Sequence, residues 1–343
     1  MVNVGLLGLG KMGISHLAIL NSLSNVKVVA VAESNHVVTR AVVKYSGIKA
    51  YTDYKKMLSE EPLDGIVICL PNDLHYQACL DAIDRNVSFF VEKPFTLSPS
   101  QSGEVVRRAQ ARGIHGMVGY VNRYTKIFEI VKNIIDNGLL GYIYDYRCSM
   151  LGSVVHGNSK ENWRSSTKMG GGCLFDYGSH CIDLAIYFFG RIVDVLTSEL
   201  KSVFSKNCED MVRAVVKHEG GLTGSIYVNW CDENQRKAYN EVEILGTKGR
   251  LVANKQDIKL FLTDPPTNRD FYKGWNSRHV TDYIENVPFY LRGEEFTKEL
   301  VDFVASIDPS SKGESRMRSS IEDAYLTDVA IDMIRNRANK INK

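Results

Sequence analysis

The sequence predicts an α/β fold in two domains, the first built on a parallel sheet and the second on a mostly antiparallel, open sheet. Its 343 residues exceed the size of one ordinary hydrophobic core. In the first third, short apolar runs alternate with helix-length segments, as in βαβ units. After about Asn122 the apolar runs lengthen and alternate with polar residues, which is typical of antiparallel strands. We therefore predict domains over residues 1–122 and 123–343.

Five strands and five helices are expected in the first domain. The strands are placed at Val2–Leu7, Val26–Ala32, Gly65–Leu70, Ser88–Val91 and Gly116–Tyr120, and the helices at Gly13–Leu23, Arg40–Tyr45, Asp53–Ser59, Asp73–Asp84 and Gln101–Arg112. Strands separated by helices of this length pair in parallel, because the chain must cross back before it can form the next strand.

The second domain is expected to open with a helix at Lys126–Asn137 and to end with one at Ser320–Arg335. Between them, alternating strands are predicted at Tyr142–Met150, Met211–His218, Leu222–Trp230, Glu241–Leu245 and Arg250–Ala253. Residues 219–221 read Glu-Gly-Gly, a hairpin signal between two of these strands. A sheet of this kind has one face on its helices and one face open. The open face predicts a homodimer or homotetramer, because exposed apolar side chains there need cover.

Composition and charge exclude several classes of protein. The chain carries 42 basic and 40 acidic side chains, so nothing in its charge asks for a nucleic acid or a membrane surface. It begins without the basic segment of a signal peptide, and no apolar run reaches the roughly 18 residues of a membrane span. Its seven cysteines include no Cys-x-x-Cys pair, which argues against a disulfide framework and a structural metal site. We expect a cytoplasmic protein without a metal.

A glycine motif follows the first predicted strand and opens the first helix. It reads Gly8-Leu9-Gly10-Lys11-Met12-Gly13, the G-x-G-x-x-G pattern of a dinucleotide site. Gly8 permits a tight turn, Gly10 lets the backbone approach a pyrophosphate, and Gly13 lets the helix pack close to the sheet. The helix N-terminus then offers N–H groups to the phosphates. This context predicts a Rossmann domain that binds a dinucleotide.

Glu33 ends the second strand, about twenty residues beyond the motif, where an acidic residue binds the adenosine ribose. Its carboxylate accepts hydrogen bonds from the ribose hydroxyls and repels a 2′-phosphate. NAD is therefore predicted as the cofactor. NADP remains the less favoured alternative, because Arg40 lies further along the chain.

Five further segments occur together in one order. They are Cys69-Leu70-Pro71-Asn72-Asp73-Leu74-His75, Glu92-Lys93-Pro94, Gly119-Tyr120-Val121-Asn122-Arg123-Tyr124, the run from Gly170 to Asp183 (GGGCLFDYGSHCID), and the run from Glu243 to Gly249 (EILGTKG). Over nearly the whole chain this set resembles the glucose–fructose oxidoreductase and inositol dehydrogenase family, Gfo/Idh/MocA. Two departures are visible: Cys69 stands where threonine is common, and Glu33 where aspartate is common.

The chemistry of three residues suits oxidation of a secondary alcohol. Asp176 and His180 are four residues apart, so on a helix they share one face. A carboxylate beside an imidazole orients it and favours a general base near neutral pH. Lys93 ends the fourth predicted strand, and a lysine there can stabilise a developing alkoxide. The resemblance implies these catalytic and substrate-binding roles for Lys93, Asp176 and His180.

The glycine motif, Glu33 and the matched segments together predict a wider site. The set for the cofactor is Gly8, Gly10, Lys11, Met12, Gly13, Glu33, Leu70, Pro71, Asn72, His75, Glu92, Lys93, Asn122, Trp163 and Arg164, and the set for the substrate adds Arg123 and Tyr124. Trp163 and Arg164 precede the glycine run at Gly170; they either touch the nicotinamide or its phosphates, or are a packing tryptophan and a surface arginine. Asp183 either touches substrate or anchors its helix. An aromatic-rich stretch at residues 261–290 can stack on a ligand, fill a subunit interface, or pack on its own sheet.

The resemblance implies hydride transfer between a nicotinamide and a hydroxyl or ketone of a sugar, inositol or sugar nucleotide. Two alternatives stay open. One is a sensor that binds NAD without turning it over, which the presence of Lys93, Asp176 and His180 disfavours. The other is a trans-dihydrodiol or pigment reductase, which only a substrate panel separates. The sequence does not name the substrate or choose between dimer and tetramer.

Overall fold

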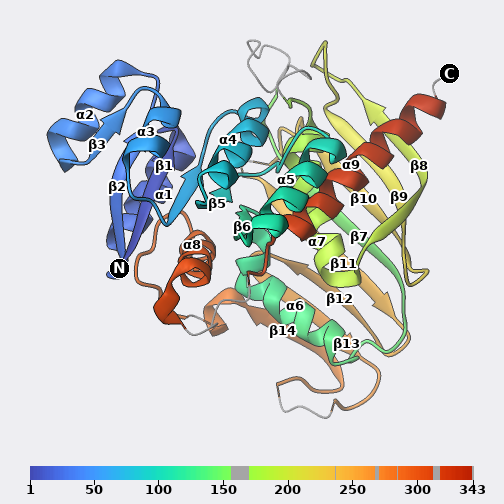
Figure 1. Ribbon diagram of the computed structural model, residues 1–343. Helices are drawn as coiled ribbons and strands as arrows, with labels where there is room; N and C mark the ends of the chain where they lie inside the picture. The colour runs from blue at the N-terminus through green and yellow to red at the C-terminus, as the bar shows by residue number, and fades with distance from the viewer. Residues whose placement is uncertain (156–169, 236, 267–269, 284, 312–316, 342–343) are drawn as a thin grey trace. The chain divides into compact units, whose positions relative to one another are not determined.

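The protein forms two compact units in a computed structural model that describes residues 1–155, 170–235, 237–266, 270–283, 285–311 and 317–341 (Figure 1). The first unit contains residues 1–124 and 286–325, and the second contains residues 125–285 and 326–343. The chain first passes from one unit to the other after Tyr124, two residues beyond the predicted boundary at Asn122. The sequence placed residues 286–325 in the second domain, whereas they group with the first unit.

The first unit holds a six-stranded, fully parallel sheet in the order β3-β2-β1-β4-β5-β6. Its strands are β1 (Val2–Leu7), β2 (Val26–Ala32), β3 (Lys49–Tyr51), β4 (Gly65–Ile68), β5 (Ser88–Val91) and β6 (Gly116–Val118). The five predicted strands are all present. The additional strand, β3, spans three residues at the sheet edge and is too short to show a period in the sequence.

Helices cover both faces of this sheet. They are α1 (Lys11–Ser22), α2 (His36–Ser46), α3 (Tyr54–Glu60), α4 (Asn72–Asp84), α5 (Pro99–Arg112) and α8 (Glu294–Ile307). One core cluster joins the sheet to α3, α4 and α5, and the other joins it to α1 and α8. Asp53 caps α3 by accepting a hydrogen bond from the N–H of Lys55, as its position before the helix predicts.

Helix α8 explains why residues 286–325 belong to the first unit. The side chain of Phe303 lies over Gly65 of β4, and its ring is 6.0 Å from that of Phe90 on β5. Without α8 this part of the sheet would expose buried side chains to water. The absence of a side chain at Gly65 lets the helix approach the sheet closely.

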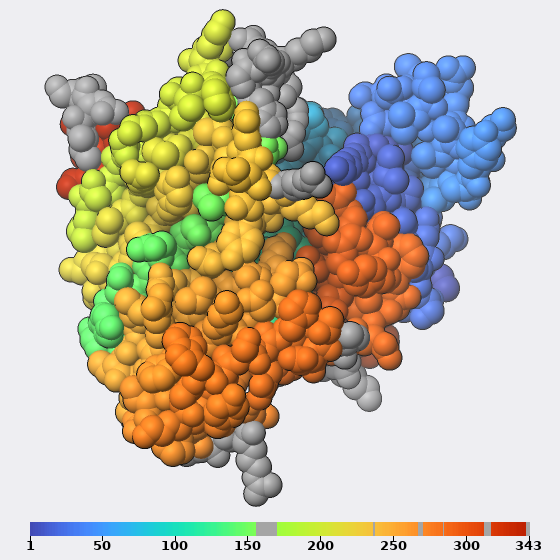
Figure 2. All heavy atoms as spheres, turned by 180° about the vertical axis from the view of Figure 1, so that it is seen from behind, coloured from blue at the N-terminus to red at the C-terminus, as the bar shows by residue number. Residues whose placement is uncertain are grey.

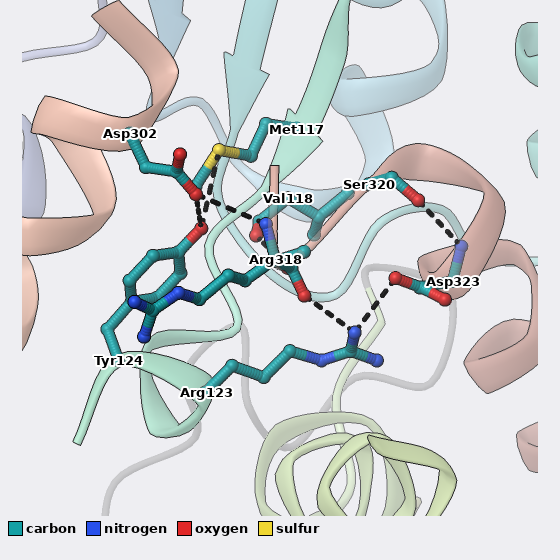
Figure 3. A network of polar contacts seen from close by, with 9 residues as sticks. Met117, Val118, Arg123, Tyr124, Asp302, Arg318, Ser320 and Asp323 are labelled. Atoms are coloured by element: carbon teal, nitrogen blue, oxygen red, sulfur yellow. Dashed lines mark hydrogen bonds and ion pairs between the residues drawn. The ribbon is translucent and has the colours of Figure 1, made fainter. Parts of the chain in front are cut away.

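A polar network also fastens this segment to the end of β6, where a short 3₁₀ helix spans Val121–Tyr124 (Figure 3). The Tyr124 hydroxyl donates to Asp302 on α8 at 2.6 Å, and the same carboxylate oxygen accepts the N–H of Arg318. The guanidinium of Arg123 donates to the carbonyl of Arg318 at 2.7 Å and to Asp323 at 2.8 Å. Arg123 and Tyr124 are therefore part of the structural framework of the first unit.

The second unit holds an eight-stranded sheet in the order β14-β13-β12-β11-β7-β10-β9-β8. Its strands are β7 (Ile143–Leu151), β8 (Ile192–Lys201), β9 (Met211–His218), β10 (Thr223–Asn229), β11 (Tyr239–Gly246), β12 (Gly249–Asn254), β13 (Asp257–Leu262) and β14 (Gly274–His279). All pairs are antiparallel except β7 with β10, so the sheet is mostly antiparallel as predicted. The strands β8, β13 and β14 were not predicted.

Helices α6 (Lys126–Asp136) and α7 (Ser179–Phe189) lie on one face of this sheet, and α9 (Ile321–Ile341) runs from the first unit into the second. Buried and partly exposed residues alternate along β10 and β11. Figure 2 shows side chains from the strands of this sheet, coloured green through orange, at the surface of the molecule. Within the described part of the chain, no helix is both long enough and apolar enough to cross a membrane.

Candidate active site

The glycine motif forms the turn between β1 and α1. Gly8 has φ of +86°, a conformation that favours glycine. A side chain at Gly13 would collide with the carbonyl oxygen of Gly8, so the helix can start this close to the strand only with glycine there. Around the position where a Cβ of Gly10 would stand, no described atom lies within 4 Å. The loop is thus tight on its protein side and open at Gly10.

Glu33 follows β2, and its carboxylate is held by the backbone. One oxygen accepts the N–H of Leu9 in the glycine loop at 2.8 Å, and the other accepts the N–H of Asn35 at 2.9 Å. These bonds join the acidic residue to the glycine loop. Arg40, the residue that favoured NADP as an alternative, donates from Nε to the carbonyl of His36 on its own helix.

The segment after β4 holds Leu70, Pro71 and Asn72, with Asn72 at the start of α4. His75 is fully buried behind it, and its two ring nitrogens lie 2.8 Å from the carbonyl oxygen of Pro94 and 2.9 Å from that of Leu70. Burial lowers the pKa of His75, which favours the neutral ring, and a neutral imidazole has one N–H with which to donate to one of these carbonyls. His75 therefore shapes the site by joining the segments that follow β4 and β5.

Glu92 and Lys93 follow β5, and the Lys93–Pro94 peptide is cis. The Glu92 carboxylate lies 2.7 Å from Nε2 of His16, a fully buried residue of α1, and its other oxygen accepts the N–H of Lys93. Burial opposes the charged form of Glu92, but the hydrogen bond and charge of His16, together with the nearby charge of Lys93, outweigh it and lower the pKa of Glu92. Lys93 is half-buried.

Asn122 lies just after β6 and is almost completely buried. Neither the oxygen nor the nitrogen of its side-chain amide has a hydrogen-bond partner among the described residues. Buried amides are normally paired, and leaving one unpaired costs about 1–3 kcal/mol. An amide of this kind at the carboxyl edge of a parallel sheet fits a ligand with polar groups of its own. Together with the open glycine loop and the carboxylate of Glu33 just after β2, it fits a bound dinucleotide.

Asp176 and His180 lie in the second unit on one continuous helical segment. Residues Leu174–Gly178 form a π-helical turn that carries Asp176, and α7 follows at once with His180 as its second residue. Both side chains are half-buried, whereas Asp183 is fully buried and suited to anchoring the helix. A π-helical turn holds more than four residues, so a spacing of four still places the two side chains about one turn apart. Such turns are frequent at functional sites.

Glu209 holds the first residue of this π-helical turn. Its carboxylate accepts the N–H of Leu174 at 3.0 Å and fills the space where a side chain at Gly172 would stand. Burial raises the pKa of Glu209. Gly172 has φ of +104°, so glycine is needed here both for the backbone and for the carboxylate. On the helical turn itself, the ring of Phe175 lies 4.4 Å from the guanidinium of Arg335 on α9.

The predicted site residues therefore separate into three groups. Those for the dinucleotide and Lys93 lie in the first unit, in the loops that follow its strands and in the first turns of α1 and α4. Asp176 and His180 lie in the second unit. Trp163 and Arg164 lie outside the described residues. Arg123 and Tyr124 were predicted to bind substrate, but they are 3% and 1% exposed and bonded to residues of the chain, so we assign them to the framework instead.

Two residues of the site were missed in the sequence. His16 follows Gly13 by three residues on α1, and the buried positions Gly13, His16, Ile19 and Leu20 repeat at helical spacing. That pattern places the imidazole on the buried face and could have marked it. For Glu209, which lies 35 residues from Leu174, no local signal exists.

Two family profiles match the chain. The profile described as an oxidoreductase family with an NAD-binding Rossmann fold matches residues 2–120, and the GFO/IDH/MocA C-terminal domain profile matches residues 128–252. A glucose-6-phosphate 3-dehydrogenase of Bacillus subtilis is 24% identical over 322 residues, which covers 89% of each chain. A D-xylose 1-dehydrogenase (NADP(+)) of Haloferax volcanii is 24% identical over 303 residues, or 85% of this chain and 86% of that one.

A solved structure of levoglucosan dehydrogenase with NADH shares the fold. It superposes with a TM-score of 0.85 at 22% identity, covering 99% of this chain and 97% of the other. The match extends over both units, as do the two family profiles taken together.

Proposed function

The chain belongs to the Gfo/Idh/MocA family of oxidoreductases and acts on CH–OH groups with a nicotinamide cofactor, and on this premise we propose that it is an NAD-dependent dehydrogenase or reductase of a sugar-like substrate. The observation that carries the proposal is the pair Asp176 and His180, half-buried and one turn apart on a helical segment. A carboxylate and an imidazole so placed suit proton transfer to or from a hydroxyl. The sugar dehydrogenases among the relatives support a sugar, inositol or sugar nucleotide as substrate.

The residues divide the chemistry as follows. When bound, the nicotinamide supplies the hydride acceptor for alcohol oxidation or the donor for ketone reduction. His180 takes the hydroxyl proton through a ring nitrogen, and Asp176 orients the ring and stabilises its protonated form. The ammonium of Lys93 stabilises negative charge on the substrate oxygen. Gly8, Gly10 and Gly13 with the first turn of α1 hold the pyrophosphate, and Glu33 holds the adenosine ribose.

NAD is proposed over NADP because two backbone N–H groups hold the Glu33 carboxylate just after β2, where we expect the adenosine ribose to bind. A 2′-phosphate there would meet a negative charge that cannot turn away. Arg40 is an exposed residue whose Nε is bonded to its own helix. One relative carries NADP in its name, so the preference for NAD in this chain is tested by measuring the dissociation constants of both cofactors.

We also propose that the protein is a cytoplasmic dimer or tetramer joined by the outer face of the second sheet. Partly exposed apolar residues line this face, among them Tyr227, Val252, Phe261 and Trp275. The ring centroids of Phe261 and Trp275 lie 5.3 Å apart, and Trp275 is 57% exposed. Such side chains need cover. All seven cysteines are free thiols, which suits a reducing compartment.

The test is NAD reduction, followed at the nicotinamide absorbance, against sugars, inositols, sugar phosphates and trans-dihydrodiols. Turnover of a sugar or inositol supports the proposal, and turnover of only a dihydrodiol favours the alternative reductase. The variant His180→Ala should lower kcat by about 10²–10⁴-fold with little change in NAD affinity. Tight NAD binding without turnover of any substrate would favour the sensor.

A further inference from the structure

The helical segment that carries Asp176 and His180 begins with a cap from a distant part of the chain. The first N–H groups of a helix have no acceptor within it, and the side chain just before the helix commonly supplies one. Cys173, which precedes the π-helical turn, makes no such bond. Instead its N–H donates to the backbone carbonyl of Glu209, and the N–H of Leu174 donates to the Glu209 carboxylate, each at 3.0 Å. Glu209 therefore caps the segment from 35 residues beyond Leu174.

Glu209 also sets the start of the turn through Gly172. Its carboxylate fills the space where a side chain at Gly172 would stand, and the carbonyl of Gly172 accepts the N–H of Asp176 at 3.2 Å. A negative charge beside a helix N-terminus is favoured by the helix dipole. Burial raises the pKa of Glu209, whereas the bond from Leu174 and the charge of Arg335 on α9 favour its charged form. The backbone of Asp176 is thus tied to Glu209 through a single residue.

The form of this turn decides how Asp176 and His180 lie relative to one another. Asp176 is within the π-helical turn at Leu174–Gly178, and His180 is the second residue of α7. A π-helical turn is rare and holds more residues than an α-helical one. If residues 174–178 relaxed to the α-helical form, Asp176 would rotate about the helix axis relative to His180. Both residues make further interactions, and Glu209 acts on the backbone that carries them.

We propose that Glu209 is a positioning residue for Asp176 and His180 and acts through the π-helical turn. Its carboxylate holds Leu174 and Gly172, so Asp176 keeps a fixed rotation relative to His180. Without the carboxylate, the N–H of Leu174 loses its acceptor and space opens beside Gly172, so the turn can take the α-helical form. Asp176 then stabilises the protonated ring of His180 less well. This inference rests on the pairing of Asp176 with His180 in the proposed function.

The first experiment needs no substrate and compares two variants of the full chain. Glu209→Ala removes both the charge and the acceptor, whereas Glu209→Gln removes the charge but keeps an oxygen for the N–H of Leu174. The readout is an NMR titration of the protein with ¹³C-labelled histidine, in which the His180 signal is the one that His180→Gln lacks. We expect the titration midpoint of His180 to fall by about 1 pH unit in Glu209→Ala, because a carboxylate beside a cation raises its midpoint by about 1–3 units.

Glu209→Gln should keep the His180 midpoint close to that of wild type, because the turn keeps its acceptor. Equal falls in both variants would show that only the charge of Glu209 acts on His180 and would overturn the proposal. An unchanged midpoint in Glu209→Ala would overturn it too.

The second readout is kcat on the substrate that the wild-type protein turns over. Glu209→Ala should lower kcat by about 10²-fold, the cost of misplacing a reacting group by about 1 Å, while KM for NAD changes little. Glu209→Gln should recover most of this loss. A kcat of wild-type size in Glu209→Ala would overturn the proposal. An inactive wild-type protein would overturn the proposed function instead, and the titration of His180 would still decide the role of Glu209.

A matched control lies at the other end of α7. His218 is 1% exposed, and its ring nitrogens lie 2.7 Å from the Gly190 carbonyl, just after α7, and 2.7 Å from the Tyr146 hydroxyl. His218→Leu therefore removes a buried, bonded side chain without touching the π-helical turn. We expect it to reduce stability and to leave the titration of His180 unchanged. If it lowers the midpoint as much as Glu209→Ala does, general loosening of α7 explains the effect and the proposal fails.

Discussion

Asp210 is the residue whose removal we expect to destabilise the second unit most clearly. It is fully buried, and its carboxylate accepts four hydrogen bonds: three from the backbone N–H groups of Val203, Phe204 and Ser205 at 2.7–2.8 Å, and one from the Trp230 indole at 2.7 Å. The three backbone donors share one oxygen, and the indole uses the other. The loop after β8 and the end of β10 are therefore held by a single side chain.

The expected magnitudes follow from this geometry. In Asp210→Asn the amide oxygen can serve only one of the two sets of donors, and its NH₂ group meets the other, so about 2 kcal/mol should be lost. In Asp210→Ala four buried donors lose their acceptor, and we expect a loss of about 4–5 kcal/mol, at the top of the range for single substitutions. With a urea m-value of about 2–3 kcal/mol per molar, the midpoints fall by about 1 M and 2 M.

The pH dependence follows from the same contacts. Burial opposes the charged form of Asp210, but hydrogen bonds from Ser205, Trp230 and Phe204 outweigh it and lower its pKa. A carboxyl group whose pKa is lowered on folding stabilises the protein at pH values above the pKa of the unfolded state. This contribution is lost as the pH falls through the pKa of the folded state. The difference between wild type and Asp210→Ala should therefore be complete near pH 7 and shrink below about pH 4.

The assay is urea unfolding followed by tryptophan fluorescence. Trp230 and Trp275, the tryptophans in the described part of the chain, both belong to the second unit, so their fluorescence reports that unit. The exposed Asp264→Ala serves as a control and should stay within about 0.5 kcal/mol of wild type. A loss below about 1 kcal/mol for Asp210→Ala at pH 7 would refute the reasoning.

Three further predictions concern the cofactor and the assembly. Glu33→Ala should lower the ratio of the NADP to the NAD dissociation constant by about tenfold or more, which corresponds to about 1.4 kcal/mol of repulsion between the carboxylate and a 2′-phosphate. The same ratio in wild type and variant would mean that Glu33 does not set the preference for NAD. Gly13→Ala should abolish NAD binding in titrations, because its Cβ collides with the Gly8 carbonyl. Gly47→Ala is the control: it lies at a helix C-terminus with no described atom near its Cβ, so this variant should bind NAD normally although it is slightly less stable. Light scattering at micromolar concentration should give a dimer or tetramer, and Trp275→Asp should lower the mass; a monomeric wild type would contradict the proposed interface.

Local patterns were sufficient for much of the fold. The alternation of apolar runs and helix-length segments predicted all but one strand of the first sheet, and Asp53 marked the start of α3. The glycine motif could be predicted from the sequence because its requirements are local: a positive φ at Gly8 and no side chain at Gly13. The spacing of Asp176 and His180 correctly indicated one helical segment, although the π-helical form of its first turn has no sequence signal that we used.

Contacts between distant residues were decided only in the tertiary structure. The sequence predicted a parallel sheet with helices between its strands, but not that α8, about 200 residues beyond β5, packs on it. Arg123 and Tyr124 carried a matching motif, yet their partners Asp302, Arg318 and Asp323 make them framework residues. The pairing of His16 with Glu92 spans 76 residues. A residue's neighbours in sequence fix its backbone preference and the face on which it lies. What covers that face depends on where the rest of the chain returns, and a local pattern does not encode that.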